Sequence, residues 1–193
     1  MSQRSSEIHY PVAGIISERK SIRAFSSRTV EEEKIRSLFE AVRWAPSSSN
    51  EQPWVFIYAT KDHPELRDMM ISTLSSSNQV WASQAPLLVF SLARKKFLRN
   101  GNDNTYALYD LGGANAFLSL QAVHLGLQIR QMAGYDRTKA VNLLNVPADL
   151  EPGVFIAIGY PGDPEQLPEP VRQKESAPRE RFLQETFVRS EAF

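Results

Sequence analysis

The stretch "RWAPSSSNEQPWVFIY", residues 43–58, decides how this chain divides into elements. Pro46 ends an apolar-periodic segment, a polar run follows, and a β-prone run starts at Trp54. The polar run is either an ordinary helix-to-strand connector or a row of small groups laid along a ligand. Its short donor and acceptor side chains, which would suit the edge of a planar heterocycle, are those of Ser47, Ser48, Asn50 and Gln52.

Apolar periodicity continues this alternation of helix and strand in both directions. Thr29 and Glu32 match a capping box, which predicts the start of the helix that Pro46 ends. Further helices are predicted over residues 11–20, 64–74, 106–125 and 138–144. Strands are predicted over residues 55–58, 87–90, 127–132 and 154–158, and the apolar run 87–90 is predicted to be buried. Helices that alternate with short apolar strands indicate a mixed α/β layer architecture.

The length of 193 residues suits a single domain with a substantial core. The chain is 42% hydrophobic and 23% charged, as globular proteins are, and no apolar run is long enough for a membrane span. The N-terminal residues contain no apolar stretch that could act as a signal peptide, so we expect a cytoplasmic protein. Lys plus Arg (22) balances Asp plus Glu (22), which argues against a nucleic-acid partner.

The chain contains no cysteine, which excludes disulfides, thiolate nucleophiles, iron–sulfur clusters and cysteine-based zinc sites. Redox chemistry would therefore need an organic cofactor. His9, His63 and His124 lie far apart in the sequence and predict neither a metal site nor a Ser-His-Asp arrangement. We expect His124 to be a packed helix residue, and we nominate no catalytic side chain.

A basic cluster occupies the segment "ERKSIRAF", residues 18–25. Arg19, Ser21 and Arg23 alternate, so their side chains share one side of an extended chain, with Lys20 adjacent. Two guanidinium groups and a hydroxyl could receive a phosphate dianion. From this octet alone, a solvated basic turn is the simpler interpretation.

A second cationic pair, Arg179 and Arg181, is also spaced for one face of an extended segment. The pair gains a binding role only if the tail folds back to the first cluster. The chain has no GxGxxG after a strand and no GxxxxGK[ST], which argues against a Rossmann or P-loop nucleotide site. Gly112 and Gly113 stand inside a helical pattern, where they would permit close helix packing or the approach of a flat ligand.

Several segments, taken in order, resemble the nitroreductase family of flavoproteins. Any one of them is weak evidence, whereas the ordered set is specific and covers nearly the whole chain. The segments are ERKSIRAF, APSSSNEQPWVF, NQVWASQAPLLVF, YDLGGANAFLSLQAVHLGL, RQMAGYD, AIGYPGDPEQLP and APRERFLQE.

The resemblance implies an α+β fold, an α/β/α sandwich around a mostly antiparallel sheet, in one domain over residues 1–193. It also implies an intertwined homodimer that binds two FMN molecules between its subunits, with the tail 170–193 extending over the partner. One subunit would hold the FMN phosphate and ribityl chain with Arg19, Lys20, Ser21, Arg23, Arg179 and Arg181. The other subunit would border the same flavin with Pro46, Ser47, Ser48 and Asn50.

Three more positions match the family at the flavin ring. Asn78 matches the residue that hydrogen-bonds the pyrimidine edge, and Ala133 and Gly134 match the place where backbone N–H groups face flavin N5. Ala133 replaces an acidic residue of some relatives, a change that a backbone contact survives. Some relatives have a lysine where this chain has Trp81, so a positive charge that would stabilise the reduced flavin is missing here.

The implied function is an oxidoreductase that passes hydride from NADPH or NADH through FMN to nitroaromatic, quinone or related small-molecule acceptors by a ping-pong mechanism. Residues 97–109, with Tyr106 and Tyr109, are expected to form a lid that shapes the choice of acceptor. Two alternatives stay open. One is a flavin-binding protein of low turnover; the other is an enzyme of the same fold with special flavin chemistry, such as dehalogenation, flavin fragmentation or enoyl reduction.

Overall fold

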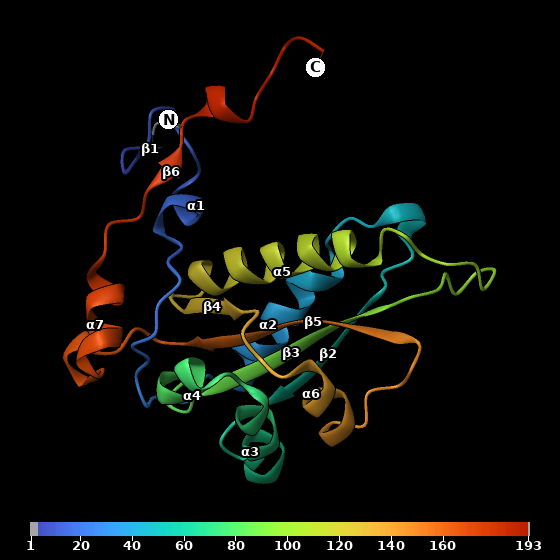
Figure 1. Ribbon diagram of the computed structural model, residues 1–193, viewed down its shortest axis with the longest axis horizontal. Coiled ribbons are helices and arrows are strands. Elements are labelled where there is room, and N and C mark those ends of the chain that lie inside the picture. Colours follow the sequence, from blue (N-terminus) through green and yellow to red (C-terminus); the bar gives the residue numbers. More distant parts are fainter. Residues whose placement is uncertain (1–3, 193) are drawn as a thin grey trace.

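A four-stranded antiparallel sheet forms the centre of the computed structural model, which describes residues 4–192 (Figure 1). All four predicted strands are present, and the two central ones extend beyond the predicted residues because their flanks pair as well. In spatial order the strands are β2 (Trp54–Ala59), β3 (Leu87–Arg94), β5 (Leu150–Gly159) and β4 (Gln128–Met132).

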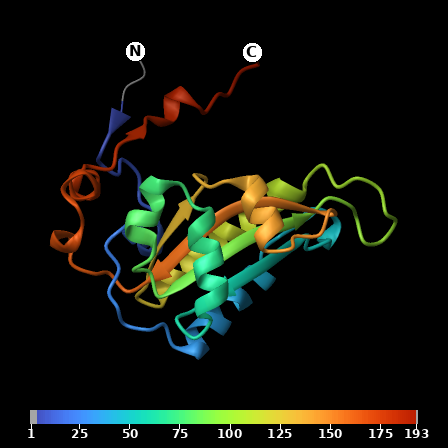
Figure 2. The same cartoon turned by 60° about the horizontal axis from the view of Figure 1, so that its bottom comes forward.

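Helices cover both faces of the sheet (Figures 1 and 2). The predicted α+β fold class, with an α/β/α sandwich and an antiparallel sheet, is therefore confirmed. A single chain does not test the predicted homodimer, which stays a prediction. One face carries α2 (Glu32–Arg43) and α5 (Ala107–His124), and the other carries α3 (Pro64–Thr73), α4 (Ser76–Ala82) and α6 (Arg137–Leu143).

Alternate residues of the central strands build a core on each face, because successive side chains of a strand point in opposite directions. Val89 packs in one core with Leu38 of α2 and Leu118 of α5. Its neighbour Phe90 packs in the other core, with Met70 of α3 among its members. The central strand β3 is buried up to its last residue, as the apolar run of the sequence predicted.

The first turn of α2 corrects the predicted capping box. The N-cap residue is Glu31 rather than Thr29, and its side chain makes no capping bond. The Glu31 carboxylate instead accepts hydrogen bonds from Tyr160 Oη at 2.7 Å and from Arg28 at 2.5 Å. These contacts replace the predicted cap by tying the start of α2 to the end of β5.

The longest described helix, α5, buries one side and leaves the other open. Its exposed side carries Leu108, Tyr109 and Phe117. At Gly112, an added Cβ would meet no atom within 4 Å. His124 is exposed in the last turn, so the prediction that it is packed is wrong for the single chain.

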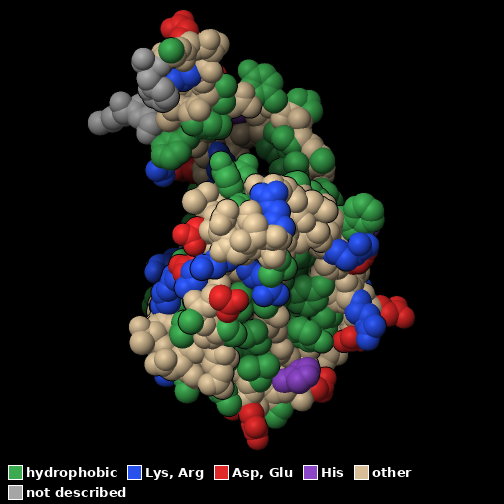
Figure 3. Space-filling model, turned by 90° about the vertical axis from the view of Figure 1, so that its right-hand side faces the viewer, with side chains coloured by type: hydrophobic (Ala, Val, Ile, Leu, Met, Phe, Trp, Pro, Cys, Tyr) green, Lys and Arg blue, Asp and Glu red, His purple; other side chains and the backbone are tan. Residues whose placement is uncertain are grey.

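None of the helices within residues 4–192 has both the length and the apolar character needed to cross a bilayer. The two ends of the described chain leave the sandwich as arms that pair with each other. Strand β1 (Arg4–Ser5) pairs antiparallel with β6 (Arg181–Phe182). Figure 3 shows these arms standing away from the body. The N-terminal arm precedes α1 (Gly14–Glu18), and the C-terminal arm follows α7 (Glu169–Ser176). These two helices flank one end of the sheet.

Candidate functional site

The two basic segments that the sequence singled out lie around one cavity of about 810 Å³. Residues 19–23 form one wall and the tail after α7 forms another, so the tail does fold back to the first cluster. The cationic side chains that line the cavity are those of Arg19, Lys20, Arg23, Arg130, Lys174, Arg179 and Arg181, and Ser21 lies among them. We call this part of the molecule the cationic end.

Arg179 fastens the tail to the first segment. Its guanidinium donates to the backbone oxygens of Arg19 at 2.5 Å and Ser17 at 2.8 Å, across about 160 residues of sequence. Arg19 in turn donates to Ser21 Oγ at 3.1 Å. Burial lowers the pKa of Arg19, and the charges of Arg179 and Arg181 lower it further. Like charges held together in this way favour an anionic ligand between them.

Glu175 of α7 fixes the second half of the basic segment. One carboxylate oxygen accepts the backbone N–H groups of Arg23 at 2.7 Å and Ala24 at 3.2 Å. The other oxygen accepts from the Arg23 guanidinium at 3.2 Å, and the Glu175 side chain is only 8% exposed. Arg23 is therefore held at the cavity wall by a buried partner before any ligand binds.

Arg130 is a cavity residue that the sequence analysis did not find. It stands on β4, donates to Ser21 O at 2.6 Å and lies over the ring of Trp81, with 5.5 Å from the guanidinium carbon to the ring centroid. Burial and the nearby Arg23 lower its pKa, while Glu175 opposes this change. The sequence did carry a signal for Arg130, because an arginine in the middle of a predicted apolar strand needs a partner when it is buried.

The predicted ring-edge residues come together from two elements. Asn78 of α4 donates from Nδ2 to Gly134 O at 3.0 Å. A Cβ added at Gly134 would lie 3.0 Å from both Asn78 Nδ2 and Ser75 Oγ. The close fit explains the glycine, and both Ala133 and Gly134 are exposed. Trp81, by contrast, is buried under α4 and stacks on Phe25.

The polar run of residues 46–52, which we call the rim, lies at the other end of the molecule. It contains a 3₁₀ turn, η1 (Ser48–Asn50), between α2 and β2. Ser49, Asn50 and Gln52 have backbone φ angles of 53°, 55° and 48°, values that residues other than glycine rarely adopt. Three positive φ angles in four residues mark a shape that an ordinary connector does not require.

One hydrogen bond holds the rim to the body, and another shapes the rim internally. Ser48 N–H donates to Asp110 Oδ2 of α5 at 3.1 Å, and Asp110 is buried. Gln52 N–H donates to Ser47 Oγ at 3.0 Å. The Ser47 hydroxyl therefore fixes the backbone of the run.

One chain does not bring the rim and the cationic end together. Figure 1 shows η1 beside the start of α5, whereas α1, α7 and β6 lie at the opposite end of that helix. Of the predicted site residues, those of segments 19–23 and 179–181 meet in one cavity, with α4 at the same end. The predicted residues of the rim, Pro46, Ser47, Ser48 and Asn50, do not line that cavity, and the segment that carries them lies apart from it.

The chain is therefore an α+β sandwich with a cationic cavity beside its sheet, an arrangement whose charge suits an anionic ligand. The model of the nitroreductase family matches residues 16–160, and the chain belongs to this family. It is 29% identical over 150 residues to an Archaeoglobus fulgidus protein provisionally named NADH dehydrogenase/NAD(P)H nitroreductase. That alignment covers 75% of this chain and 82% of the relative.

Solved structures agree with this assignment. A crystal structure described as an oxidoreductase containing FMN superposes with a TM-score of 0.91 at 29% identity, covering 97% of this chain and 95% of that one. A Desulfovibrio desulfuricans protein in complex with FMN, provisionally called a nitroreductase, superposes with a TM-score of 0.72 at 26% identity. That match covers 96% of this chain and 99% of the other.

Proposed function

We propose that this protein is an FMN-dependent oxidoreductase that takes electrons from NADH or NADPH and delivers them to small acceptors such as nitroaromatics and quinones. One observation carries the proposal: two cationic segments from opposite parts of the sequence line a single cavity. Family membership and the FMN-containing relatives support a flavin phosphate as the anion that this cavity receives.

The residues of the cationic end fit a phosphate dianion. Arg23 is held by Glu175, and Arg19 is held in a cluster with Arg179 and Arg181, so little side-chain freedom is lost on binding. Guanidinium groups bind phosphate through paired hydrogen bonds. We assign the phosphate and ribityl chain to Arg19, Lys20, Ser21, Arg23, Arg179 and Arg181, and we add Arg130.

A flavin ring would run from this cavity toward Asn78, Ala133 and Gly134. A second cavity of about 450 Å³ adjoins the first, since Arg19 and Ser21 line both. Its other walls come from α1, α5 and β4, and they are largely apolar, with Gln131 among their polar residues. An open apolar slot beside a phosphate site suits a flat aromatic ring.

We infer that a second copy of the chain completes this site with its rim. The rim has the polar groups and the strained backbone of a binding edge, yet it lies far from the cationic end of its own chain. The exposed side of α5 joins the two ends, and it combines apolar side chains with the open Gly112. Two such faces packed around a two-fold axis would place each rim beside the partner's cationic end.

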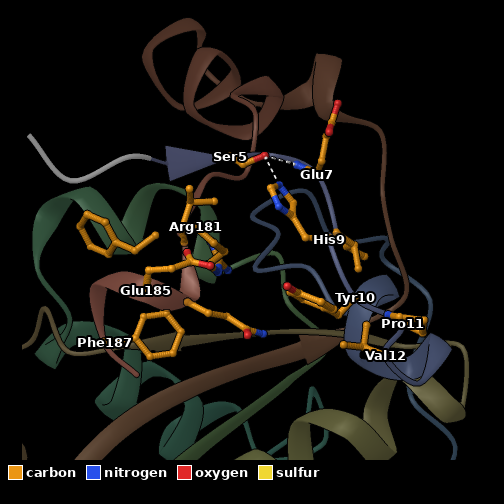
Figure 4. A pocket seen from close by; sticks show the side chains of 13 residues that line it. Ser5, Glu7, His9, Tyr10, Pro11, Val12, Arg181, Glu185 and Phe187 are labelled. Atoms are coloured by element: carbon orange, nitrogen blue, oxygen red, sulfur yellow. Dashed lines mark hydrogen bonds between the residues drawn. The ribbon is translucent and has the colours of Figure 1, made fainter. Parts of the chain in front are cut away.

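The arms support the same inference. A two-stranded ribbon of two residues per strand is marginally stable at best alone in water, yet β1 and β6 stand away from the body. Together they enclose a cavity of about 520 Å³ (Figure 4), where Tyr10, Val12 and Phe187 surround an open space. Tyr10 and Phe187 are 61% and 67% exposed. A partner subunit lying between body and arm would cover them.

Bound FMN supplies the redox chemistry, since it accepts hydride from a reduced nicotinamide and returns electrons to an acceptor. The chain's own residues bind the phosphate, hold the ring edge and shape the space above it. Donor and acceptor would use that one space in turn, so we expect ping-pong kinetics. No side chain of the described site is assigned as a general acid or base.

Anaerobic mixing of the purified protein with NADH or NADPH tests the proposal. The protein should be yellow. Its flavin absorbance at about 450 nm should fall within seconds and return when a quinone is added. Very slow bleaching would favour a binding protein of low turnover. Fast bleaching without turnover of nitro compounds or quinones would favour special flavin chemistry, and a colourless protein that takes up no FMN would refute the proposal.

A further inference from the structure

Glu51 joins two loops of the same chain at the rim. Its Oε2 accepts a hydrogen bond from Leu98 N–H at 2.9 Å, and its Oε1 lies 3.2 Å from Arg99 Nε. The Glu51 side chain is only 8% exposed, whereas that of Arg99 is 54% exposed. A shielded carboxylate with a donor on each oxygen makes an interaction stronger than an ordinary surface ion pair.

The loop that Glu51 holds, residues 95–104, projects from the body between β3 and α5 (Figure 1). Its shape is set internally, because Phe97 N–H donates to Asn102 O at 2.8 Å and Gly101 N–H donates to Phe97 O at 2.9 Å. These bonds define the loop but not its direction. The Glu51 contacts at Leu98 and Arg99 attach its tip to the rim.

The same residue lies within the strained part of the rim. Glu51 stands between Asn50 and Gln52, both at positive φ. Such conformations persist only where surrounding contacts hold them. Asp110 holds the rim on one side through Ser48 N–H, and Glu51 holds it to the projecting loop on the other.

We propose that Glu51 is a positioning residue that locks the 95–104 loop onto the rim and thereby sets the size of acceptor admitted beside the flavin. This inference rests on the proposed function, in which the rim borders the partner's flavin. The loop and the start of α5 present Leu98, Tyr106 and Tyr109, which are 71%, 55% and 81% exposed. Leu98 belongs to the tip of the loop, so fixing the tip fixes the position of Leu98 beside the two tyrosines.

Two substitutions separate the contacts of Glu51. Glu51→Ala removes both, whereas Glu51→Gln keeps an oxygen for Leu98 N–H and loses the charge that faces Arg99. Glu32→Gln is the matched control, because it breaks an exposed ion pair with Arg36 on α2. Each holoprotein is assayed with p-benzoquinone as the small acceptor and 2-methyl-1,4-naphthoquinone as the bulky one.

Glu51→Ala should change the ratio of kcat/KM between the two quinones by about 10-fold, through KM for the bulky one, because a small misplacement of a positioning group is costly. Glu51→Gln should retain most of the wild-type ratio. Glu32→Gln should match the wild type. A ratio that stays within two-fold of wild type in Glu51→Ala would overturn the inference.

Limited proteolysis tests the attachment independently of turnover. Trypsin should cut after Lys96 or Arg99 several-fold faster in Glu51→Ala than in wild type, with Glu51→Gln in between. Equal cleavage rates in folded samples would contradict the inference. A wild-type protein that does not bind FMN would instead contradict the proposed function. A Glu51→Ala protein with full FMN content and unchanged acceptor selectivity would contradict this inference alone.

Discussion

The cationic end and the rim are built in opposite ways. The cationic end joins segments about 150 to 160 residues apart through Glu175 and Arg179. The rim is one continuous run with three positive φ angles, held by hydrogen bonds to Asp110 of α5 and to Leu98 of the projecting loop. The cationic end therefore comes together within one folded chain, whereas we propose that the rim serves the flavin of a partner chain.

The largest effect on FMN affinity should come from keeping the rim of one chain away from the cationic end of another. Gly112→Phe adds a ring where the single chain has open space, so the chain should fold. The ring would nevertheless obstruct the α5 face, and we expect a monomer that binds FMN at least about 100-fold more weakly. Light scattering and flavin absorbance measure both properties, with Gly112→Ala as the control. A dimer with full FMN content would contradict the inferred interface.

A smaller effect should come from the cationic end alone. Arg23→Ala removes a charged phosphate ligand, which should raise the Kd for FMN by about 10- to 100-fold. Glu175 would keep its two backbone donors, so folding should change little. Titration with FMN and with riboflavin, which lacks the phosphate, measures the difference, and Arg36→Ala is the control. An equal loss for both flavins would exclude a phosphate contact.

Removing the contact that holds the rim to α5 should lower the thermal stability of the protein. Asp110→Ala leaves Ser48 N–H without its acceptor beside a buried position. The expected cost is about 1–3 kcal/mol, which corresponds to a Tm lower by about 2–10 °C for a chain of this size. Thermal unfolding of the FMN-free protein measures it. An unchanged Tm would show that the rim holds its shape without Asp110.

The smallest effect should come from a charge cluster that faces neither ligand nor rim. Hydrogen bonds from Tyr160 and Arg28 lower the pKa of Glu31 to about 2. A carboxyl group whose pKa is lowered stabilises the fold at pH values above its ordinary pKa of 4.5. This contribution is lost as the pH falls from 4.5 toward about 2. Tyr160→Phe should therefore lower stability slightly at pH 7 and leave FMN affinity unchanged. Acid unfolding curves that coincide with wild type would contradict this role.

The elements that bury apolar residues were predictable from the sequence. The strand β3 and the helix α5 follow apolar runs whose burial the structure confirms, whereas β2 lies in its predicted place but is mostly half-buried. The helix α7 has no buried residue, so no apolar periodicity indicates it. The cap of α2 was mispredicted because Tyr160, far away in sequence, provides the contact.

The candidate site was predictable where its residues alternate along the chain. Arg19, Ser21 and Arg23 share a cavity, as their spacing suggested. The supporting residues were not predictable, because Glu175 and Glu51 act through partners that only the fold brings near. Their sequence neighbours resemble ordinary polar surface.

The central claim is that each flavin lies between the cationic end of one chain and the rim of another. Mixing two defective chains tests it most directly: Arg19→Ala/Arg23→Ala, which lacks the cationic end, and Ser48→Trp, which blocks the rim. Neither homodimer should bind FMN well, but their heterodimer has one site with both intact parts. We predict about one FMN per heterodimer, with recovered NAD(P)H oxidation; purified heterodimers that bind no FMN would contradict the claim.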